Sequence, residues 1–308
     1  MSVSRTNFLS TTINLTCVLF VGGTLAQSAD INRNCTAKEI QAHPGNVSYR
    51  TLNATGALDI KGLGDANIGI PLPTWTWSTG VQNIRNSEDN LTFFYQQPVW
   101  LDTHGTDLAS EDLEYEMCYL TLSGYSASAQ KRGQGDSGDC TKFFNQQCVD
   151  EWRKVLSDEG SRYIRSNITQ NPCKSLLQLA PESCKDFQDV SRSAGSIPPE
   201  NRTCPFGLGD PDYDTVFRGA TLANEAAAKN DTTDFLVYDQ TVTSIVPFFA
   251  LAWSRSAPVQ WSDARVMCLS TPNITEGSRK PSGVPSLGSR FALDPIIILG
   301  SILLYMLL

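Results

Sequence analysis

The sequence predicts an α+β fold in which a sandwich-like, antiparallel β core holds an inserted, disulfide-stapled helical hairpin. Segments rich in β-branched and aromatic residues lie in both halves of the chain and are bounded by Gly, Asn, Asp and Ser, as strands are. Two segments between them repeat apolar residues every three or four positions, as amphipathic helices do. Grouped strands with helices inserted between them are typical of the α+β class.

Six segments are expected to form the β core. Three precede the helical insert, at residues 68–77, 91–100 and 113–122, and three follow it, at residues 235–238, 243–253 and 265–270. The strings YEMCYLT around Cys118 and RVMCLST around Cys268 are alike, which indicates related strands of one sheet.

Two helices are expected in an insert that spans about residues 140–188. The first covers residues 141–156, with Thr141 in the N-cap position. The second covers residues 172–187 and kinks or breaks at Pro181, because proline cannot continue a helix without disrupting it.

The remaining segments are expected to be loops, short elements or linkers. Residues 127–139 have the composition of an exposed loop, residues 195–214 that of a connector, and residues 220–229 that of a short Ala-rich helix. The predicted boundaries are an irregular N-terminal segment at 27–66, an ectodomain at 67–272, and a polar linker with the anchor-site spacer at 273–294.

The N-terminal segment, residues 1–26, has the order of a signal peptide. Arg5 lies before a short apolar run, and small residues follow it, which favours cleavage after Ala26 with Ala29 as the alternative. An uncleaved membrane helix would need about 20 apolar residues, and polar side chains interrupt this run.

Residues 295–308 form a second apolar stretch, shorter than the roughly 20 residues that span a bilayer. A GPI attachment signal combines small residues, a polar spacer and an apolar tail that is removed. Ser282 with Gly283 fits this order, and Ser286 with Gly288 is an alternative that leaves a shorter spacer. The sequence therefore favours a GPI anchor at Ser282 over a transmembrane or buried helix.

Eight cysteines remain between the two predicted signals, and an even number in a secreted chain indicates four disulfides. In a helical hairpin, nested bridges Cys148–Cys173 and Cys140–Cys184 would join both ends; a Cys140–Cys148 bridge would require the first helix to begin after Cys140. No two of these cysteines have the close spacing of a zinc site, and no metal or cofactor is expected. The expected disulfide cysteines are Cys35, Cys118, Cys140, Cys148, Cys173, Cys184, Cys204 and Cys268.

Eight Asn-X-Ser/Thr sequons lie in the predicted mature chain, more than its composition gives by chance, which favours a glycosylated surface. The net charge is −8 and basic residues form no cluster beyond pairs, so a nucleic acid is not expected as a partner. The expected partners are the membrane, through the anchor, and cell-wall glycans. The expected N-glycosylation sites are Asn34, Asn46, Asn53, Asn90, Asn167, Asn201, Asn230 and Asn273.

The string GDSG at residues 135–138 is similar to the nucleophile motif of chymotrypsin-like serine proteases, and His43, Asp102 and Ser137 occur in that family's order. The segment between His43 and Ser137 is too short for two barrels, and the flanking motifs of the family are missing. We therefore interpret GDSG as a polar turn.

The string DLEYE at residues 112–116 resembles the catalytic Glu-X-Asp-X-Glu strand of the GPI-anchored fungal wall glucan and chitin transglycosylases, a jelly-roll family. The resemblance implies Asp112 as the nucleophile, Glu114 as its helper and Glu116 as the acid/base, all on one strand face. The first two acidic types are exchanged relative to the family, so a solvent-facing strand side is the favoured interpretation and a wall-polysaccharide enzyme is the alternative.

Three other patterns have a simple explanation. Asp210, Asp212 and Asp214 alternate as in a calcium loop, but the glycine and glutamate of an EF-hand are missing. Trp75 and Trp77 share a strand face and are better explained by core packing than by stacking on sugars. His104 in DTHGTD is interpreted as a turn residue.

The string GDC, seven residues, CV and then a tryptophan, at residues 138–152 with MCYL upstream, resembles uncharacterised secreted proteins of filamentous ascomycetes. The resemblance implies a location and no activity. The sequence thus predicts a GPI-anchored glycoprotein of a fungal plasma membrane or wall, with a structural, adhesive or ligand-binding ectodomain that is not an enzyme.

Overall fold

The computed structural model describes two antiparallel sheets and a layer of helices, which confirms the α+β class. The described residues are 51–64, 72–85, 93–166, 172–199, 205–209, 215–222, 235–255 and 260–282. The predicted signal peptide and apolar tail lie outside them, and so do His43, two of the eight expected disulfide cysteines and most of the expected glycosylation sites. These cysteines and sequon residues are Cys35, Cys204, Asn34, Asn46, Asn90, Asn167, Asn201 and Asn230.

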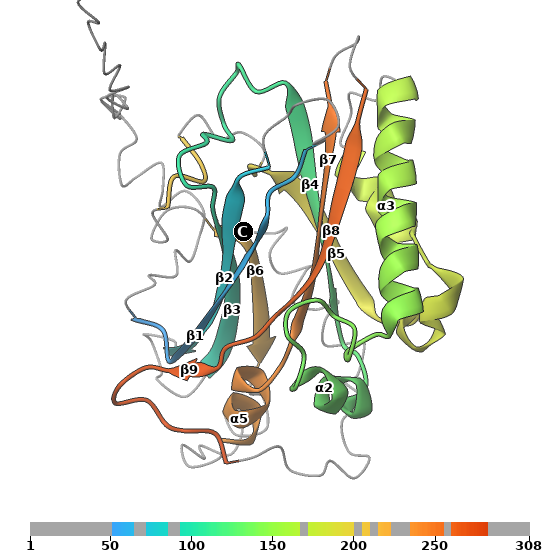
Figure 1. Ribbon diagram of the computed structural model, residues 1–308. Helices are drawn as coiled ribbons and strands as arrows, with labels where there is room; N and C mark the ends of the chain where they lie inside the picture. The colour runs from blue at the N-terminus through green and yellow to red at the C-terminus, as the bar shows by residue number, and fades with distance from the viewer. Residues whose placement is uncertain are drawn as a thin grey trace, which may run out of the picture. The chain divides into compact units, whose positions relative to one another are not determined.

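The first sheet has the strand order β6-β3-β2-β1-β9, with every neighbouring pair antiparallel (Figure 1). Its strands are β1 (Ala54–Lys61), β2 (Thr74–Arg85), β3 (Phe93–Asp102), β6 (Thr215–Leu222) and β9 (Asn273–Ile274). β1 lies within the segment predicted to be irregular, and that prediction is wrong for these residues. The alternation of buried and exposed residues in β1 gives little hydrophobic signal in the sequence, because the small residues Ala54 and Gly56 occupy its most buried positions.

The second sheet has the order β5-β4-β7-β8, also antiparallel throughout. Its strands are β4 (Tyr115–Ser123), β5 (Ser191–Ile197), β7 (Val246–Ser254) and β8 (Ser262–Leu269). The two similar strings around Cys118 and Cys268 lie in β4 and β8, on either side of β7, which confirms the prediction that they belong to one sheet.

The second sheet is covered on both faces, and β7 shows this most directly because all nine of its residues are buried. Phe248 packs against the first sheet, where its ring centroid lies 5.1 Å from that of Trp77. The next residue, Phe249, points the other way and lies 4.7 Å from the Trp152 ring in the helical layer. Burial of each phenyl ring stabilises the fold by about 1.5–3 kcal/mol. The layers are therefore sheet, sheet and helix (Figure 1).

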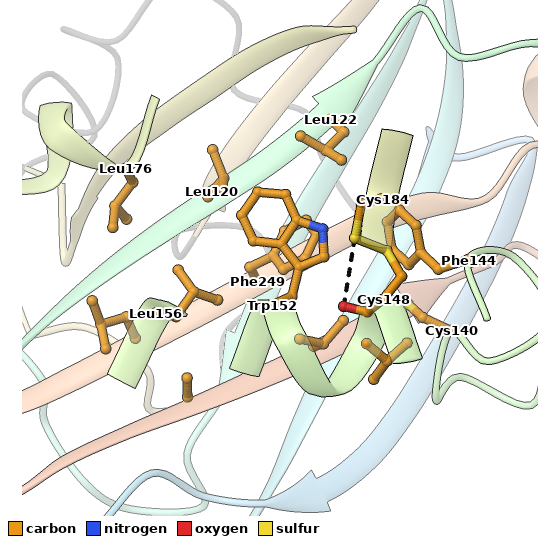
Figure 2. Close-up of a cluster of buried hydrophobic side chains, with 14 of the residues drawn as sticks. Leu120, Leu122, Cys140, Phe144, Cys148, Trp152, Leu156, Leu176, Cys184 and Phe249 are labelled. Atoms are coloured by element: carbon orange, nitrogen blue, oxygen red, sulfur yellow. Dashed lines mark hydrogen bonds between the residues drawn. A yellow bond between two sulfur atoms is a disulfide. The ribbon is translucent and has the colours of Figure 1, made fainter. Parts of the chain in front are cut away.

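The long helix α3 (Gln146–Ser166) packs across the second sheet through Val149, Trp152 and Leu156 (Figure 2). It begins five residues later than predicted, because the segment before it is held in a turn and Cys140 has a positive φ of 66°. The cap is Asn145, whose side-chain oxygen accepts a hydrogen bond from the Cys148 amide at 2.8 Å.

The predicted second helix is two short 3-10 helices, η3 (Pro172–Gln178) and η4 (Glu182–Phe187), separated at Pro181. The predicted break at this proline is confirmed. η3 lies against β4 and β5, whereas η4 folds back toward α3, so the two segments do not form one arm of a hairpin.

This break explains why the predicted nested disulfides, Cys148–Cys173 and Cys140–Cys184, are wrong. The structure has Cys118–Cys173, which ties η3 to β4, and Cys148–Cys184, which ties η4 to the start of α3. The third bridge, Cys140–Cys268, joins the turn before α3 to β8 and spans 128 residues of sequence. Among the described cysteines, two of the three bridges thus attach the helical layer to the second sheet.

Two further predictions of secondary structure are wrong for local reasons. Residues 127–139 include the helix α2 (Ala127–Gly133), which Ser126 caps by accepting a hydrogen bond from Ala129 N. Residues 235–238 enter the helix α5 (Leu236–Val242) instead of a strand, because Tyr238 and Val242, four positions apart, pack together on Tyr95.

The predicted connector and the predicted Ala-rich helix each begin inside a strand. Residues 195–197 complete β5, and residues 220–222 complete β6. The rest of the predicted Ala-rich helix lies outside the described residues.

Candidate functional site

The three acidic residues of DLEYE do not share a strand face. β4 begins at Tyr115, so Glu116 lies in the strand, whereas Asp112 and Glu114 lie in the turn and loop before it and are exposed. Glu116 forms an ion pair with Arg255, with 3.5 Å between Oε1 and Nε. The predicted alternation fails because the strand begins too late to include the first two carboxylates.

Trp75 and Trp77 belong to the core between the two sheets. Their side chains are 1% and 0% exposed, so neither indole face is available to a sugar ring. The interpretation of this pair as core packing is confirmed.

The GDSG string forms a turn whose order depends on Asp136. The Asp136 carboxylate accepts hydrogen bonds from four backbone N–H groups, those of Gly138, Cys140, Lys142 and Phe143, at 2.8–3.2 Å. The neighbouring Ser137 is exposed, and its side chain hydrogen-bonds to the Asp139 carboxylate, which also accepts from Thr141. The turn therefore holds the chain between α2 and α3, as the polar-turn interpretation expects.

Asp102 contacts a different histidine from the one in the protease-like order. His104 has a φ of 53°, as a turn residue can, and its Nδ1 lies 3.5 Å from Asp102 Oδ2. Its Nε2 lies 3.0 Å from Thr76 Oγ1, and this hydroxyl donates its one hydrogen to Asp59 Oδ1 at 2.6 Å. Because that hydrogen is directed at Asp59, His104 does not accept it, and the cluster links three strand ends rather than activating a nucleophile.

A surface cavity of about 410 Å³ lies beside the Cys148–Cys184 disulfide, and we call it the disulfide hollow. This volume falls in the range of small-molecule sites, roughly 300–1,000 Å³. Its floor is buried and consists of the disulfide with Phe144 and Phe187. Its rim is polar and carries both charge signs. The rim residues are Asn145, Gln147, Glu182, Ser183, Lys185 and Asp186.

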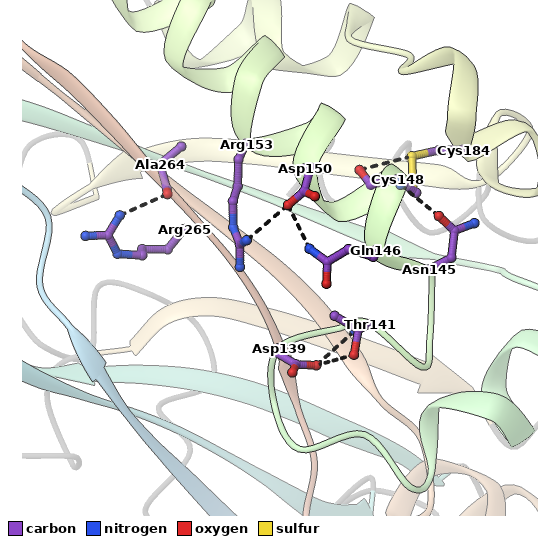
Figure 3. Close-up of polar contacts among 10 residues, drawn as sticks. All are labelled: Asp139, Thr141, Asn145, Gln146, Cys148, Asp150, Arg153, Cys184, Ala264 and Arg265. Carbon is purple, nitrogen blue, oxygen red and sulfur yellow. Dashed lines mark hydrogen bonds and ion pairs between the residues drawn. A yellow bond between two sulfur atoms is a disulfide. The ribbon is translucent and has the colours of Figure 1, made fainter.

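Glu151 of α3 hydrogen-bonds to the start of η4 and so holds together the two segments that line the disulfide hollow. Its carboxylate accepts hydrogen bonds from the hydroxyl of Ser183 and from the backbone N–H groups of Ser183 and Glu182, both at 2.9 Å. These bonds, with the Ser183 hydroxyl first, hold the pKa of Glu151 below its usual value. Figure 3 shows Asn145, Cys148 and Cys184 together at the start of α3.

Sequence reasoning missed the disulfide hollow because its walls come from two segments more than 30 residues apart. The Cys148–Cys184 bridge joins these segments, and the predicted pairing assigned both cysteines to other partners. The apolar spacing of α3 gave no signal for a cavity, because the floor residues pack as ordinary core residues do.

Three of the predicted modification sites lie among the described residues. Asn273 is exposed in β9, whereas Asn53 is half-buried: its Oδ1 accepts from Asn83 N at 2.8 Å and its Nδ2 donates to Ser278 Oγ at 3.3 Å. Ser282, the predicted anchor site, donates from its hydroxyl to Asp239 Oδ2 at 2.5 Å.

Within the described part of the chain, no group of three or more His, Cys, Asp or Glu side chains is arranged to hold a metal ion. Asp210, Asp212 and Asp214 lie outside that part. No helix in the described ranges combines the length and apolar character needed to cross a membrane.

Comparison with known proteins finds no family model that matches the chain and no significant match among curated proteins or solved structures. The three disulfides between described cysteines are the strongest indication of where the protein works. Disulfides of this kind are typical of secreted and extracellular proteins, because the cytosol keeps thiols reduced.

Proposed function

We propose that this chain is a GPI-anchored, N-glycosylated glycoprotein of a fungal cell surface, whose ectodomain binds a small ligand without catalysis. The observation that carries the proposal is the covalent attachment of the helical layer, in which the Cys148–Cys184 bridge fixes a polar-rimmed hollow. A cavity whose walls are already fixed loses little conformational entropy when it binds, which favours recognition.

The non-catalytic part of the proposal is supported by the placement of the candidate residues. The DLEYE carboxylates are spread over a loop and a strand, and the two tryptophans that could have stacked on a sugar are in the core. The rim of the disulfide hollow supplies amides, carboxylates and an ammonium group, which suit hydrogen bonding to a small polar molecule.

The fungal part of the proposal depends on the resemblance of residues 138–152. In the structure Gly138 has a φ of 105°, Cys140 and Cys148 form disulfides, and Trp152 lies in the core. These four residues of the string thus have structural roles in this chain.

Treatment of expressing cells with phosphatidylinositol-specific phospholipase C tests the anchor. We expect the glycoprotein to move from the cells to the medium together with a known GPI-anchored protein. Retention of this chain on cells that release the known protein would contradict the proposal. Binding to the hollow is tested separately, by screening the released chain against small polar ligands and repeating any binding with the Lys185→Ala and Asp186→Ala variants.

A further inference from the structure

A buried carboxylate in α5 holds the segment that follows β9. Asp239 is 4% exposed and accepts hydrogen bonds from two side-chain nitrogens of Arg279, at 3.3 and 3.2 Å. It also accepts from the backbone N–H of Ser282 at 3.2 Å and from the Ser282 hydroxyl at 2.5 Å. All four donors thus come from the segment that the sequence places in a polar linker.

Other contacts fix the same segment along its length. The Arg279 guanidinium lies 4.4 Å from the centre of the Phe235 ring, and the Arg279 carbonyl accepts a hydrogen bond from the Tyr238 hydroxyl at 2.8 Å. Nearer to β9, Thr275 N donates to the Asn53 carbonyl at 3.0 Å. We call residues 273–282 the C-terminal strap.

Separation of the strap from α5 is unfavourable. Asp239 would lose its four hydrogen bonds and its ion pair, and hydrogen bonds to a charged group are stronger than those between neutral groups. The strap also supplies β9, which pairs with the start of β1. We therefore expect it to stay attached to the domain as long as the domain is folded.

We infer that the C-terminal strap is a fixed part of the ectodomain, so that the lipid anchor leaves the domain directly at its α5 end. This inference rests on the proposed function, in which Ser282 carries the anchor. α5 and β9 lie at the same end of the sheets, whereas β7 ends at Ser254 and β8 begins at Ser262 at the opposite end (Figure 1). The α5 end then faces the bilayer and the β7–β8 end faces away from it.

This orientation also places the other surface features of the ectodomain nearer to the bilayer or farther from it. The start of α3 and the disulfide hollow belong to the half nearer α5, because Cys140 is bonded to Cys268 close to the end of β8. The cluster of Asp59, Thr76 and His104 belongs to the opposite end, where β1 ends and β2 begins.

Trypsin tests the inference, because the Arg279–Lys280 bond lies in the strap and the following Lys280–Pro281 bond resists trypsin. Three forms of the phospholipase-released protein are compared: the unmodified chain, Asp239→Asn, and the control Asp158→Asn, which changes an exposed acid of α3 paired only with Lys154. We expect Asp239→Asn to be cut after Arg279 at least about tenfold faster than the other two, as measured by the peptide that ends there. Equal rates in all three would overturn the inference.

Hydrogen exchange on the unmodified chain keeps the test independent of whether Asp239→Asn folds. The amides of Thr275 and Ser282 are hydrogen-bonded in the strap, so we expect them to exchange at least about tenfold more slowly than in the unfolded chain. Exchange at the unfolded rate would show a flexible linker and overturn the inference. If phospholipase releases nothing, the anchor is refuted, and detergent-solubilised protein still allows both measurements of the strap.

Discussion

Substitution of Asp136 tests whether one carboxylate orders the turn that leads into α3. Its four N–H donors include those of Cys140 and Phe143, both 0% exposed, and these two lose their acceptor when the carboxylate is removed. Each unsatisfied buried donor costs about 1–3 kcal/mol, so Asp136→Ala should lower the free energy of unfolding by about 2–4 kcal/mol. Asp136→Asn retains one acceptor oxygen and should cost about half as much.

The assay is urea denaturation with the disulfides intact, with thermal unfolding as a second reading. For a domain of this size, a loss of 1 kcal/mol lowers Tm by roughly 2–4 °C. The matched control is Asp139→Ala, because Asp139 lies in the same turn but is exposed, and its hydrogen bonds are to the side chain of Ser137 and to Thr141 rather than to buried backbone N–H groups. If Asp136→Ala and Asp139→Ala destabilise the protein equally, the reasoning about this turn is wrong.

Three further predictions concern the helical layer. Trp152→Ala should lower the free energy of unfolding by about 3–5 kcal/mol, because it opens a cavity between α3 and the second sheet; a loss below about 1 kcal/mol in urea denaturation would contradict the packing. Joint replacement of Cys140 and Cys268 by alanine should lower the free energy of unfolding by about 4–5 kcal/mol, since the bridge closes a loop of 128 residues. An unchanged midpoint of urea denaturation would argue against this bridge. The hydrogen bonds from Ser183 and Glu182 hold the pKa of Glu151 in the folded protein below its ordinary value of 4.5, so its contribution to stability is complete above that pH and is lost as the pH falls through the folded pKa. The stability difference between the unmodified chain and Glu151→Gln should therefore shrink on acidification below pH 4.5, and a difference that does not change with pH would refute this role.

The β core could be predicted because its central strands have strong local patterns. β7 is apolar on both faces, and in β4 Tyr115, Met117 and Tyr119 alternate with Glu116 and Cys118, so the sequence predicts both strands close to their observed bounds. β1 was missed because its buried positions carry Ala54 and Gly56, which have little hydrophobic signal. α5 was mistaken for a strand because four residues cannot separate a period of two from a period of 3.6.

The disulfides could not be predicted because their pairing depends on how short segments fold back. The predicted pairing assumed that residues 172–187 run back along the first helix as one arm of a hairpin, whereas η3 and η4 pack in different places, so that Cys173 bonds to β4 and Cys184 to α3. The disulfide hollow could not be predicted from the sequence for the same reason. The sequence predicts a linker for the strap because the composition of residues 273–282 is polar, and composition does not show that the buried Asp239 lies opposite its donors.

A non-reducing peptide map of the phospholipase-released, deglycosylated protein tests the account most directly. It reports both on the disulfides that attach the helical layer and on the anchor. We predict linked peptides for Cys118–Cys173, Cys140–Cys268 and Cys148–Cys184, and a C-terminal peptide that ends at Ser282 with the remnant of the anchor. Free thiols at these six cysteines, or a Cys148–Cys173 link, would contradict it.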